Sequence, residues 1–269
     1  MAFNTSGESH KNGLKGEGDT KCLIENSYTK LFGNAPTVLR RGGTKYKEDL
    51  LVNNNFKLSC KNRQSKSGSF DYLNSSASVK LLTSQAAKKL KKFLDSKKHL
   101  YKGMGFNRKT LKPVIDIERA KFNDLSENVL LSMSSSEIER IVLDGMKEYI
   151  KDPDFYFSIT HRPRKRLILF PAQELPLIKL IKNQTGLKFS LAQTKGKTSA
   201  RILIEDNTGS VHDFGLRLRL VLNNGIAALL AGTDASKNSS SQVVLKLQQD
   251  EPDKQIDNIL PQFMETITF

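Results

Sequence analysis

Apolar residues recur at helical spacing in three parts of the chain, and each part is predicted to form a helix. The expected helices cover residues 19–32, 85–100 and 134–150. The first stops at Gly33 and Asn34, a pair typical of helix ends. The second carries lysines on the side opposite its apolar residues. The third opens with Ser134 and Glu137, which have the spacing of a capping box.

Short apolar runs of strand length dominate the remainder of the chain. They cover residues 155–159, 167–170, 187–192, 200–204, 216–222 and 243–247. The first two are joined by a very basic tip and predict a hairpin. Helices mixed with many strands indicate an α/β (α+β) fold, expected as a single domain with a mixed central β-sheet flanked by helices. Along the chain we distinguish a hairpin and first helix (1–80), a helical part (81–152) and a β-rich part (153–269).

A second hairpin, over residues 47–61, has a register that can be counted. Three asparagines, which tolerate the left-handed backbone of tight turns, separate two apolar runs. A three-residue loop pairs Val52 with Phe56, and counting outward places Asp49 opposite Ser59. Lys61 then lies on the diagonal from Asp49, on the same polar face. A carboxylate, a hydroxyl and an ammonium are therefore expected on one patch.

This patch suits the hydrolysis of a phosphodiester. The Asp49 carboxylate is expected to hold Mg²⁺, a hard cation that polarises phosphate and activates water. Lys61 would orient the attacking water or offset the charge of the transition state. The backbone carbonyl of Cys60 is a candidate further ligand, and Glu17 could act on the metal through a water. The alternative is an ordinary surface hairpin, since an acid and a lysine at this spacing are common in basic proteins.

Composition favours a polyanionic partner. The chain of 269 residues has 43 Lys and Arg against 28 Asp and Glu, a net charge of +15, and each phosphate neutralised by such a protein releases counterions. No apolar run approaches the ~18 residues needed to span a bilayer, so a membrane role is not expected. Two cysteines are too few for a disulfide framework, which favours a reducing, cytoplasmic location.

Charge is also unevenly distributed along the chain. Residues 88–102 are rich in lysine, residues 115–154 are acidic in balance, and residues 161–201 are basic again. We expect a positive face backed by an acidic one, although a charge run is also typical of any solvated surface.

The hairpin motif resembles that of the PD-(D/E)XK nuclease superfamily, and within it type II restriction endonucleases of the HhaI-like kind, which cut short palindromes. The resemblance covers residues 13–73, 155–170 and 189–201, about half the chain. Two departures stand out: Glu48 replaces the proline before the first acid, and Ser59 replaces the second acid. The resemblance implies that Asp49 is the only strand carboxylate of the catalytic set Asp49, Ser59, Lys61 and Glu17.

Several polar residues are candidates for contacts with DNA. The segment after Lys61 belongs to the resemblance, the 162–166 tip is suited to phosphates, and the 193–201 loop has Gln, Lys and Arg side chains suited to base edges. The alternative for this loop is an ordinary mobile surface loop. The candidates are Gln64, Ser65, Lys66, Arg162, Arg164, Lys165, Arg166, Gln193, Lys195, Lys197, Ser199 and Arg201.

Taken together, these features predict a site-specific endonuclease that hydrolyses double-stranded DNA with Mg²⁺, as the restriction component of a type II restriction-modification system. A homodimer on a palindromic site and a companion DNA methyltransferase are the expected partners. Two alternatives stay open: a non-catalytic nucleic-acid-binding protein, and a repair or junction-resolving nuclease of the same fold.

Overall fold

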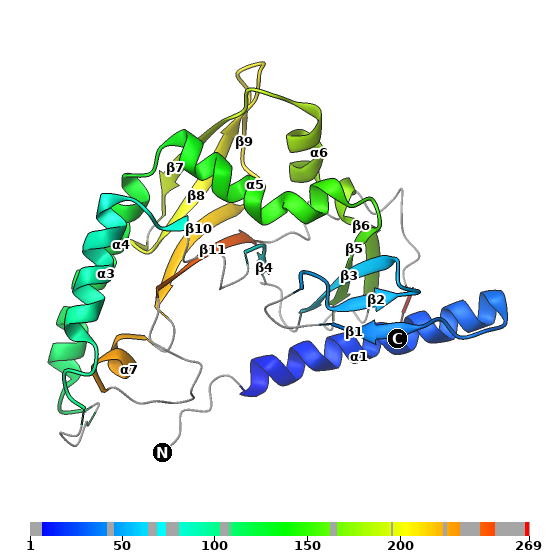
Figure 1. Cartoon of the computed structure of the whole chain (residues 1–269), viewed down its shortest axis with the longest axis horizontal. Coiled ribbons are helices and arrows are strands. Elements are labelled where there is room, and N and C mark those ends of the chain that lie inside the picture. Colours follow the sequence, from blue (N-terminus) through cyan, green and yellow to red (C-terminus); the bar gives the residue numbers. More distant parts are fainter. Residues whose placement is uncertain are drawn as a thin grey trace. The chain divides into compact units, whose positions relative to one another are not determined.

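The protein is described here from a computed structural model in which runs of strands and runs of helices follow one another along the chain (Figure 1). The structure describes residues 7–41, 46–63, 69–73, 81–102, 107, 109–161, 166–194, 196–222, 225–231, 243–250 and 267–268. The helices are α1 (Gly7–Phe32), α3 (Gln85–Lys97), α4 (Lys112–Leu131), α5 (Ser135–Lys151), α6 (Pro176–Asn183) and α7 (Gly225–Ala231), with a 3-10 turn η3 (Ala172–Glu174).

Among the described residues, the strands belong to two sheets. The strands are β1 (Val38–Arg40), β2 (Leu50–Val52), β3 (Phe56–Arg63), β4 (Ser69–Asp71), β5 (Phe155–His161), β6 (Arg166–Pro171), β7 (Lys188–Gln193), β8 (Ser199–Glu205), β9 (Val211–His212), β10 (Leu216–Leu222), β11 (Val243–Asp250) and β12 (Ile267–Thr268). One sheet has the order β1-β2-β3-β5-β6-β12, and the other β4-β11-β10-β8-β7 with β9 beside β8. The mixed α/β class is confirmed. The expectation of one central sheet is corrected to two, because strand patterning does not identify a strand's neighbours.

The chain also divides into two compact units. Unit 1 consists of residues 1–3, 71–144 and 187–248, and unit 2 of residues 4–70, 145–186 and 249–269. The predicted hairpin lies in unit 2 and the predicted base-reading loop in unit 1.

In unit 2, β3 lies at the centre of its sheet and is paired on both sides. It runs antiparallel to β2 and parallel to β5, with Ser59 beside Phe157. The α1 side of the sheet holds the apolar cluster Val38, Leu50, Val52 and Leu58, against which Ile24 packs. The other face carries Phe155 and Phe157, whose rings lie 4.7 and 5.0 Å from the ring of Tyr149 in α5. Both faces of β3 are therefore covered.

The hairpin turn has the backbone that its asparagines predict. Asn53 and Asn54 have φ angles of 49° and 58°, in the left-handed region that asparagine tolerates. The Asn53 side chain accepts a hydrogen bond from the Thr37 backbone N–H at 3.0 Å, and the Asn53 N–H donates to the Thr37 carbonyl at 2.8 Å. These bonds fix the turn to the segment that leads into β1.

In unit 1, alternation along the strands separates a buried face from a half-buried one. Leu216, Leu218, Leu220 and Leu222 of β10 are buried, while the residues between them are partly exposed. The same alternation in β8 buries Ala200, Ile202 and Ile204. Helices α3, α4 and α7 contact one another, α4 contacts β8, and α7 contacts β10.

Helix boundaries were predicted unequally well. The capping box is confirmed, since Glu137 accepts from the Ser134 N–H at 2.9 Å and the Ser134 hydroxyl accepts from the Glu137 N–H at 3.3 Å. Helix α1 begins at Gly7 rather than residue 19, and α4, α6 and α7 were not predicted. Among the described helices, none combines the length and apolar character needed to cross a membrane.

Candidate functional site

The β2–β3 register is the predicted one. Val52 pairs with Phe56, Leu51 with Lys57 and Leu50 with Leu58. Regular pairing stops at Leu50, and the next residue, Asp49, donates its backbone N–H to the Leu58 carbonyl at 2.7 Å. Asp49 therefore lies at the mouth of the hairpin, beside Ser59, as counted from the sequence.

The Asp49 carboxylate binds two donors of β3 through one oxygen. Oδ2 accepts a hydrogen bond from the Cys60 backbone N–H at 2.6 Å and another from the Ser59 hydroxyl at 3.3 Å. The side chain thus binds a backbone donor at the point where ladder pairing with β2 ends. Hydrogen bonds to an ionised carboxylate are among the stronger ones in proteins. They hold the Asp49 carboxylate in one orientation across the hairpin.

The Ser59 hydroxyl connects Asp49 to Tyr149 in α5. Ser59 is 1% exposed and also hydrogen-bonds to the Tyr149 side chain. Since the single hydroxyl proton of Ser59 is donated to Asp49, the phenol of Tyr149 is the donor to Ser59. Burial raises the pKa of the Tyr149 phenol, and so do the charges of Asp49 and Glu148. These effects exceed that of the hydrogen bond with Ser59, which lowers the pKa. Tyr149 therefore stays protonated and able to donate.

The Cys60 thiol points to the α1 side of the sheet, and its pKa is affected by several nearby charges. Burial raises its pKa, and the negative charges of Asp49 and Glu17 act in the same direction, whereas a hydrogen bond with Thr20 and the charge of Lys61 oppose them. Asp49, Glu17 and Lys61 therefore all lie near enough to the Cys60 thiol to affect its charge. The thiol remains neutral, so Cys60 is not a nucleophile.

Thr20 connects α1 to β5 through a hydrogen bond. Its hydroxyl donates to the Gly16 carbonyl at 2.9 Å and lies 3.1 Å from the hydroxyl of Ser158 in β5. Both Thr20 and Ser158 are fully buried. Because Glu17 is adjacent to Gly16 on the same helix, these bonds fix the position of the Glu17 backbone relative to β3 and β5.

Two other charged residues of the hairpin, Glu48 and Lys57, have ion-pair partners. Glu48, 4% exposed, forms an ion pair with Arg41 at 3.3 Å. Lys57 pairs with Asp152 at 2.7 Å, a hydrogen bond that raises the pKa of Lys57. Glu48 is thus held by Arg41, in contrast to Asp49, whose carboxylate accepts from donors of β3. The charge pattern around Asp49 differs, because hydroxyl and backbone donors rather than cations are hydrogen-bonded to its carboxylate.

A protein-only metal cage is not found in the described part of the chain, where no three His, Cys, Asp or Glu side chains come together. Mg²⁺ does not require one, since it is commonly held by one or two carboxylates with waters and substrate phosphates. Both hydrogen bonds of the Asp49 carboxylate fall on Oδ2. One oriented carboxylate with an oxygen that accepts no hydrogen bond from the described residues is therefore compatible with Mg²⁺.

The predicted base-reading loop of unit 1 has a different character, because its polar side chains bind acids. Gln193 donates to Glu127 at 3.3 Å, Lys197 binds Asp124 at 2.6 Å, and Arg201 binds Asp213 at 2.9 Å. The hydroxyl of Ser199 is buried and has no hydrogen-bond partner among the described residues. Segments 115–154 and 161–201 thus neutralise each other in part, where opposed faces were expected.

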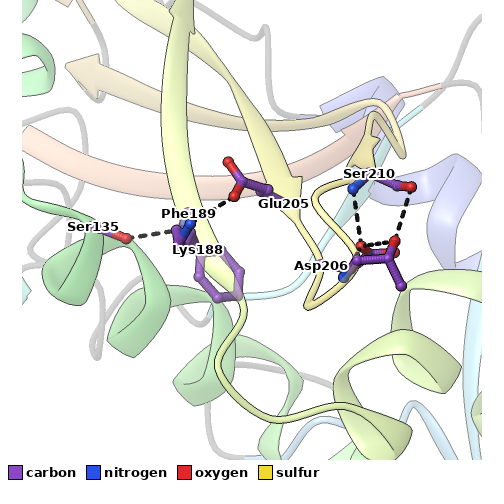
Figure 2. A network of polar contacts seen from close by, with 7 residues as sticks. Ser135, Lys188, Phe189, Glu205, Asp206 and Ser210 are labelled. Carbon is purple, nitrogen blue, oxygen red and sulfur yellow. Dashed lines mark hydrogen bonds and ion pairs between the residues drawn. The ribbon is translucent and has the colours of Figure 1, made fainter.

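Strands β7 and β8, which this loop connects, are fixed by local polar contacts at their end away from the loop (Figure 2). The Phe189 N–H donates to the Ser135 hydroxyl at 3.0 Å, and Lys188 pairs with Glu205 at 2.7 Å. After β8, Asp206 accepts from the Ser210 N–H at 3.0 Å and lies 2.7 Å from His212. Hydrogen bonds with His212 and Thr208 lower the pKa of Asp206. The two strands that the loop connects are therefore anchored at their far end.

Several predicted contact residues lie outside the described residues. They are Gln64, Ser65, Lys66, Arg162, Arg164, Lys165 and Lys195; for Arg166 the structure describes only the backbone, in β6. Two residues of the site were missed in the sequence. Tyr149 is 90 positions from Ser59, and Thr20 has no motif around it, so only the folded chain brings them to the hairpin.

Comparison with known proteins does not assign the chain to a family. No family model matches it, and searches of curated proteins and of solved structures found no significant match. The assignment of a function therefore depends on the geometry of the site and on the sequence pattern.

Proposed function

We propose that this protein is a Mg²⁺-dependent endonuclease that hydrolyses double-stranded DNA at a specific site, as type II restriction enzymes do. The observation that carries the proposal is the Asp49 carboxylate, oriented by Ser59 and the Cys60 N–H at the mouth of the hairpin. The net charge of +15 supports a polyanionic substrate. A homodimer on a palindromic site and a companion methyltransferase belong to the same proposal.

Asp49 is proposed to bind the metal through its carboxylate. Mg²⁺ would supply Lewis-acid polarisation of the scissile phosphate. The Ser59 hydroxyl keeps the carboxylate in one orientation, and Tyr149 keeps the Ser59 proton directed at Asp49 by donating to the Ser59 oxygen. The proposed part of Glu17, through a water, is to add negative charge at the same place. The backbone carbonyl of Cys60 is the proposed second protein ligand.

Lys61 is proposed to act on the substrate rather than on the metal. Lys61 follows Ser59 by two positions in β3, so the two side chains lie on the same face of the strand. An ammonium there can orient the attacking water and offset the negative charge that grows on the phosphorus centre. Its neighbour on the same face, Lys57, is held by Asp152 and is not given a catalytic role.

A non-catalytic nucleic-acid-binding protein is the second candidate, favoured by the net charge of +15, which needs no catalytic site to attract a polyanion. The Asp49 patch argues against it. A protein that only binds phosphate gains nothing from a fixed carboxylate beside a lysine, because the carboxylate repels the ligand. A repair or junction-resolving nuclease would use the same patch and differ only in its DNA substrate.

The test is incubation of the purified protein with supercoiled plasmid DNA in Mg²⁺, in Ca²⁺ and in excess chelator, followed by gel electrophoresis. We expect discrete fragments in Mg²⁺ and intact DNA in Ca²⁺ and in chelator. A smear in Mg²⁺ would indicate a nuclease without site specificity. Intact plasmid in every condition, with retained binding, would contradict the nuclease and favour the non-catalytic binder.

A further inference from the structure

Helix α3 of unit 1 presents four lysines to solvent, which we call the lysine face: Lys88, Lys89, Lys91 and Lys92. All four are exposed, while Ala87, Leu90 and Leu94 on the opposite side are buried. At 100° per residue, the four side chains span one continuous arc of the helix. Asp95 is the one acid within the described helix.

The four charges of the lysine face have no acidic partners among the described residues, unlike several other lysines of the helices. In α4, Lys112 pairs with Asp116 at 2.7 Å and Lys121 with Glu118 at 3.5 Å. In α1, Lys21 pairs with Glu25 at 3.5 Å. Even within α3, Lys97 on the side towards α4 pairs with Glu118 at 3.1 Å.

This arrangement has an energetic cost for the isolated protein. Lys88 and Lys92 are four positions apart, and Lys88 with Lys91 and Lys89 with Lys92 are three apart, so like charges are neighbours on the helix surface. Like-charge pairs at this spacing destabilise a helix by about as much as opposite charges stabilise it. A polyanion laid along α3 would remove the repulsion and release its own counterions.

We propose that the lysine face of α3 is a contact surface for the phosphate backbone of duplex DNA, separate from the hairpin site and independent of base sequence. The inference takes its partner from the proposed function but needs no catalysis. Lysine suits this task, since its ammonium is a compact point charge on a flexible stem and binds phosphate without fixed geometry. Such contacts position a protein on DNA and allow it to slide, but do not select a sequence.

The test compares two full-length variants with equal loss of charge. In the face variant, Lys88, Lys89, Lys91 and Lys92 are changed to Gln. In the control variant, four exposed lysines that are each ion-paired, Lys112, Lys121, Lys179 and Lys188, are changed to Gln. Gln is nearly as good a helix former as Lys, so α3 should remain folded; circular dichroism checks this for both variants.

Binding to a labelled 30-base-pair duplex of arbitrary sequence is measured by fluorescence anisotropy in chelator, over a range of salt concentrations. Each phosphate contact contributes about 0.9 to the slope of log affinity against log salt. We expect the slope of the face variant to fall by about 2 or more, and that of the control variant to stay within about 0.5 of the wild type. A Lys-to-Arg version of the face variant should retain the wild-type slope.

Equal slopes for the face and control variants would overturn the inference, because net charge alone would then explain binding. An unchanged slope together with lost binding to phosphatidylserine vesicles would also overturn it and identify an anionic membrane as the partner. Since the assay contains no Mg²⁺, its outcome is separate from that of the cleavage assay. If the wild type cleaves DNA but the face variant keeps the wild-type salt slope, only the proposal for the lysine face is refuted. If the salt slope of the face variant falls but the wild type does not cleave DNA, only the proposed nuclease activity is refuted.

Discussion

The Asp49 hairpin of unit 2 and the 193–201 loop of unit 1 contain similar residue types but use them in opposite ways. At the hairpin, a hydroxyl and a backbone N–H hold the Asp49 carboxylate in place. In the loop, Lys197 and Arg201 each have an acid within 3 Å. The hairpin carboxylate is thus oriented without being neutralised, whereas the loop cations are already neutralised.

The difference shows how each region could act on a polyanion. A fixed carboxylate without a cationic hydrogen-bond partner can bind a metal directly. A lysine or arginine in an ion pair must give up its acidic partner before it can bind a phosphate or a base edge. The free energy of DNA binding is then smaller by the free energy of the ion pair that is lost. Exposed pairs are worth about 0.2–1 kcal/mol, so the exchange is feasible. We therefore expect large effects from substitutions at the hairpin and small ones at the loop.

The largest effect is expected at Asp49. Asp49→Asn keeps an oxygen that can accept the Cys60 N–H but removes the charge, so cleavage should fall at least about a thousandfold because metal catalysis contributes several kcal/mol. DNA binding in chelator should be kept or become tighter. Asp116→Asn, on the exposed surface of α4, is the matched control. Cleavage by Asp49→Asn near the wild-type rate would show that Asp49 does not take part in the cleavage reaction.

Lys61 should come next. Lys61→Gln is expected to lower the cleavage rate about 100-fold to 1000-fold, the range found when a donor to the transition state is lost. The Mg²⁺ concentration for half-maximal cleavage should change little, since Lys61 is not a ligand. Lys57→Gln, two residues away on the same face and paired with Asp152, provides the comparison. If the cleavage rate falls equally in Lys61→Gln and Lys57→Gln, the loss is due to the lower positive charge of β3 and not to a specific role of Lys61.

Ser59 and Tyr149 should have intermediate effects. Ser59→Ala and Tyr149→Phe are each expected to lower the cleavage rate ~10–100-fold and to raise the Mg²⁺ concentration for half-maximal cleavage, because both act by holding Asp49. Since they belong to one chain of hydrogen bonds, the double variant should lose less than the product of the single losses. Fully multiplicative losses would show that Tyr149 acts independently of Ser59.

Release of the loop cations should have the smallest effect. Asp213→Asn frees Arg201, and Asp124→Asn leaves Lys197 with only its longer ion pair to Glu127 at 3.8 Å. Each should therefore tighten DNA binding about twofold to fivefold, the amount that an exposed ion pair contributes. Anisotropy at one fixed salt concentration is the measurement, with Asp116→Asn as the control for lost negative charge. If all three variants bind equally tightly, the loop has no special part in recognition.

The sequence predicts the hairpin accurately because its determinants are local. Two asparagines adopt the left-handed backbone at the turn, and alternation along β3 fixes which side chains share a face. The capping box of α5 was predictable for the same reason. The polar face, however, is not exposed as a surface hairpin would be: Ser59 is buried under α5.

What the sequence could not provide are contacts between distant segments. Tyr149 reaches Ser59 across 90 positions, and Lys197 binds Asp124 across 73. The segregation of basic and acidic segments suggested opposed faces, but segregated segments are also those that can pair once folded. Likewise, the alternation of apolar residues along the strands indicated which residues are buried. It did not indicate that the strands form two sheets.

The central claim is that the Asp49 carboxylate binds the metal used for cleavage. The most direct measurement is the rate of plasmid cleavage against Mg²⁺ concentration for the wild type and for Asp49→Asn purified in parallel. The account predicts saturable, Mg²⁺-dependent cleavage into discrete fragments by the wild type and no cleavage by the variant at any Mg²⁺ concentration. Superimposable curves for the two proteins, or cleavage that persists in excess chelator, would contradict it.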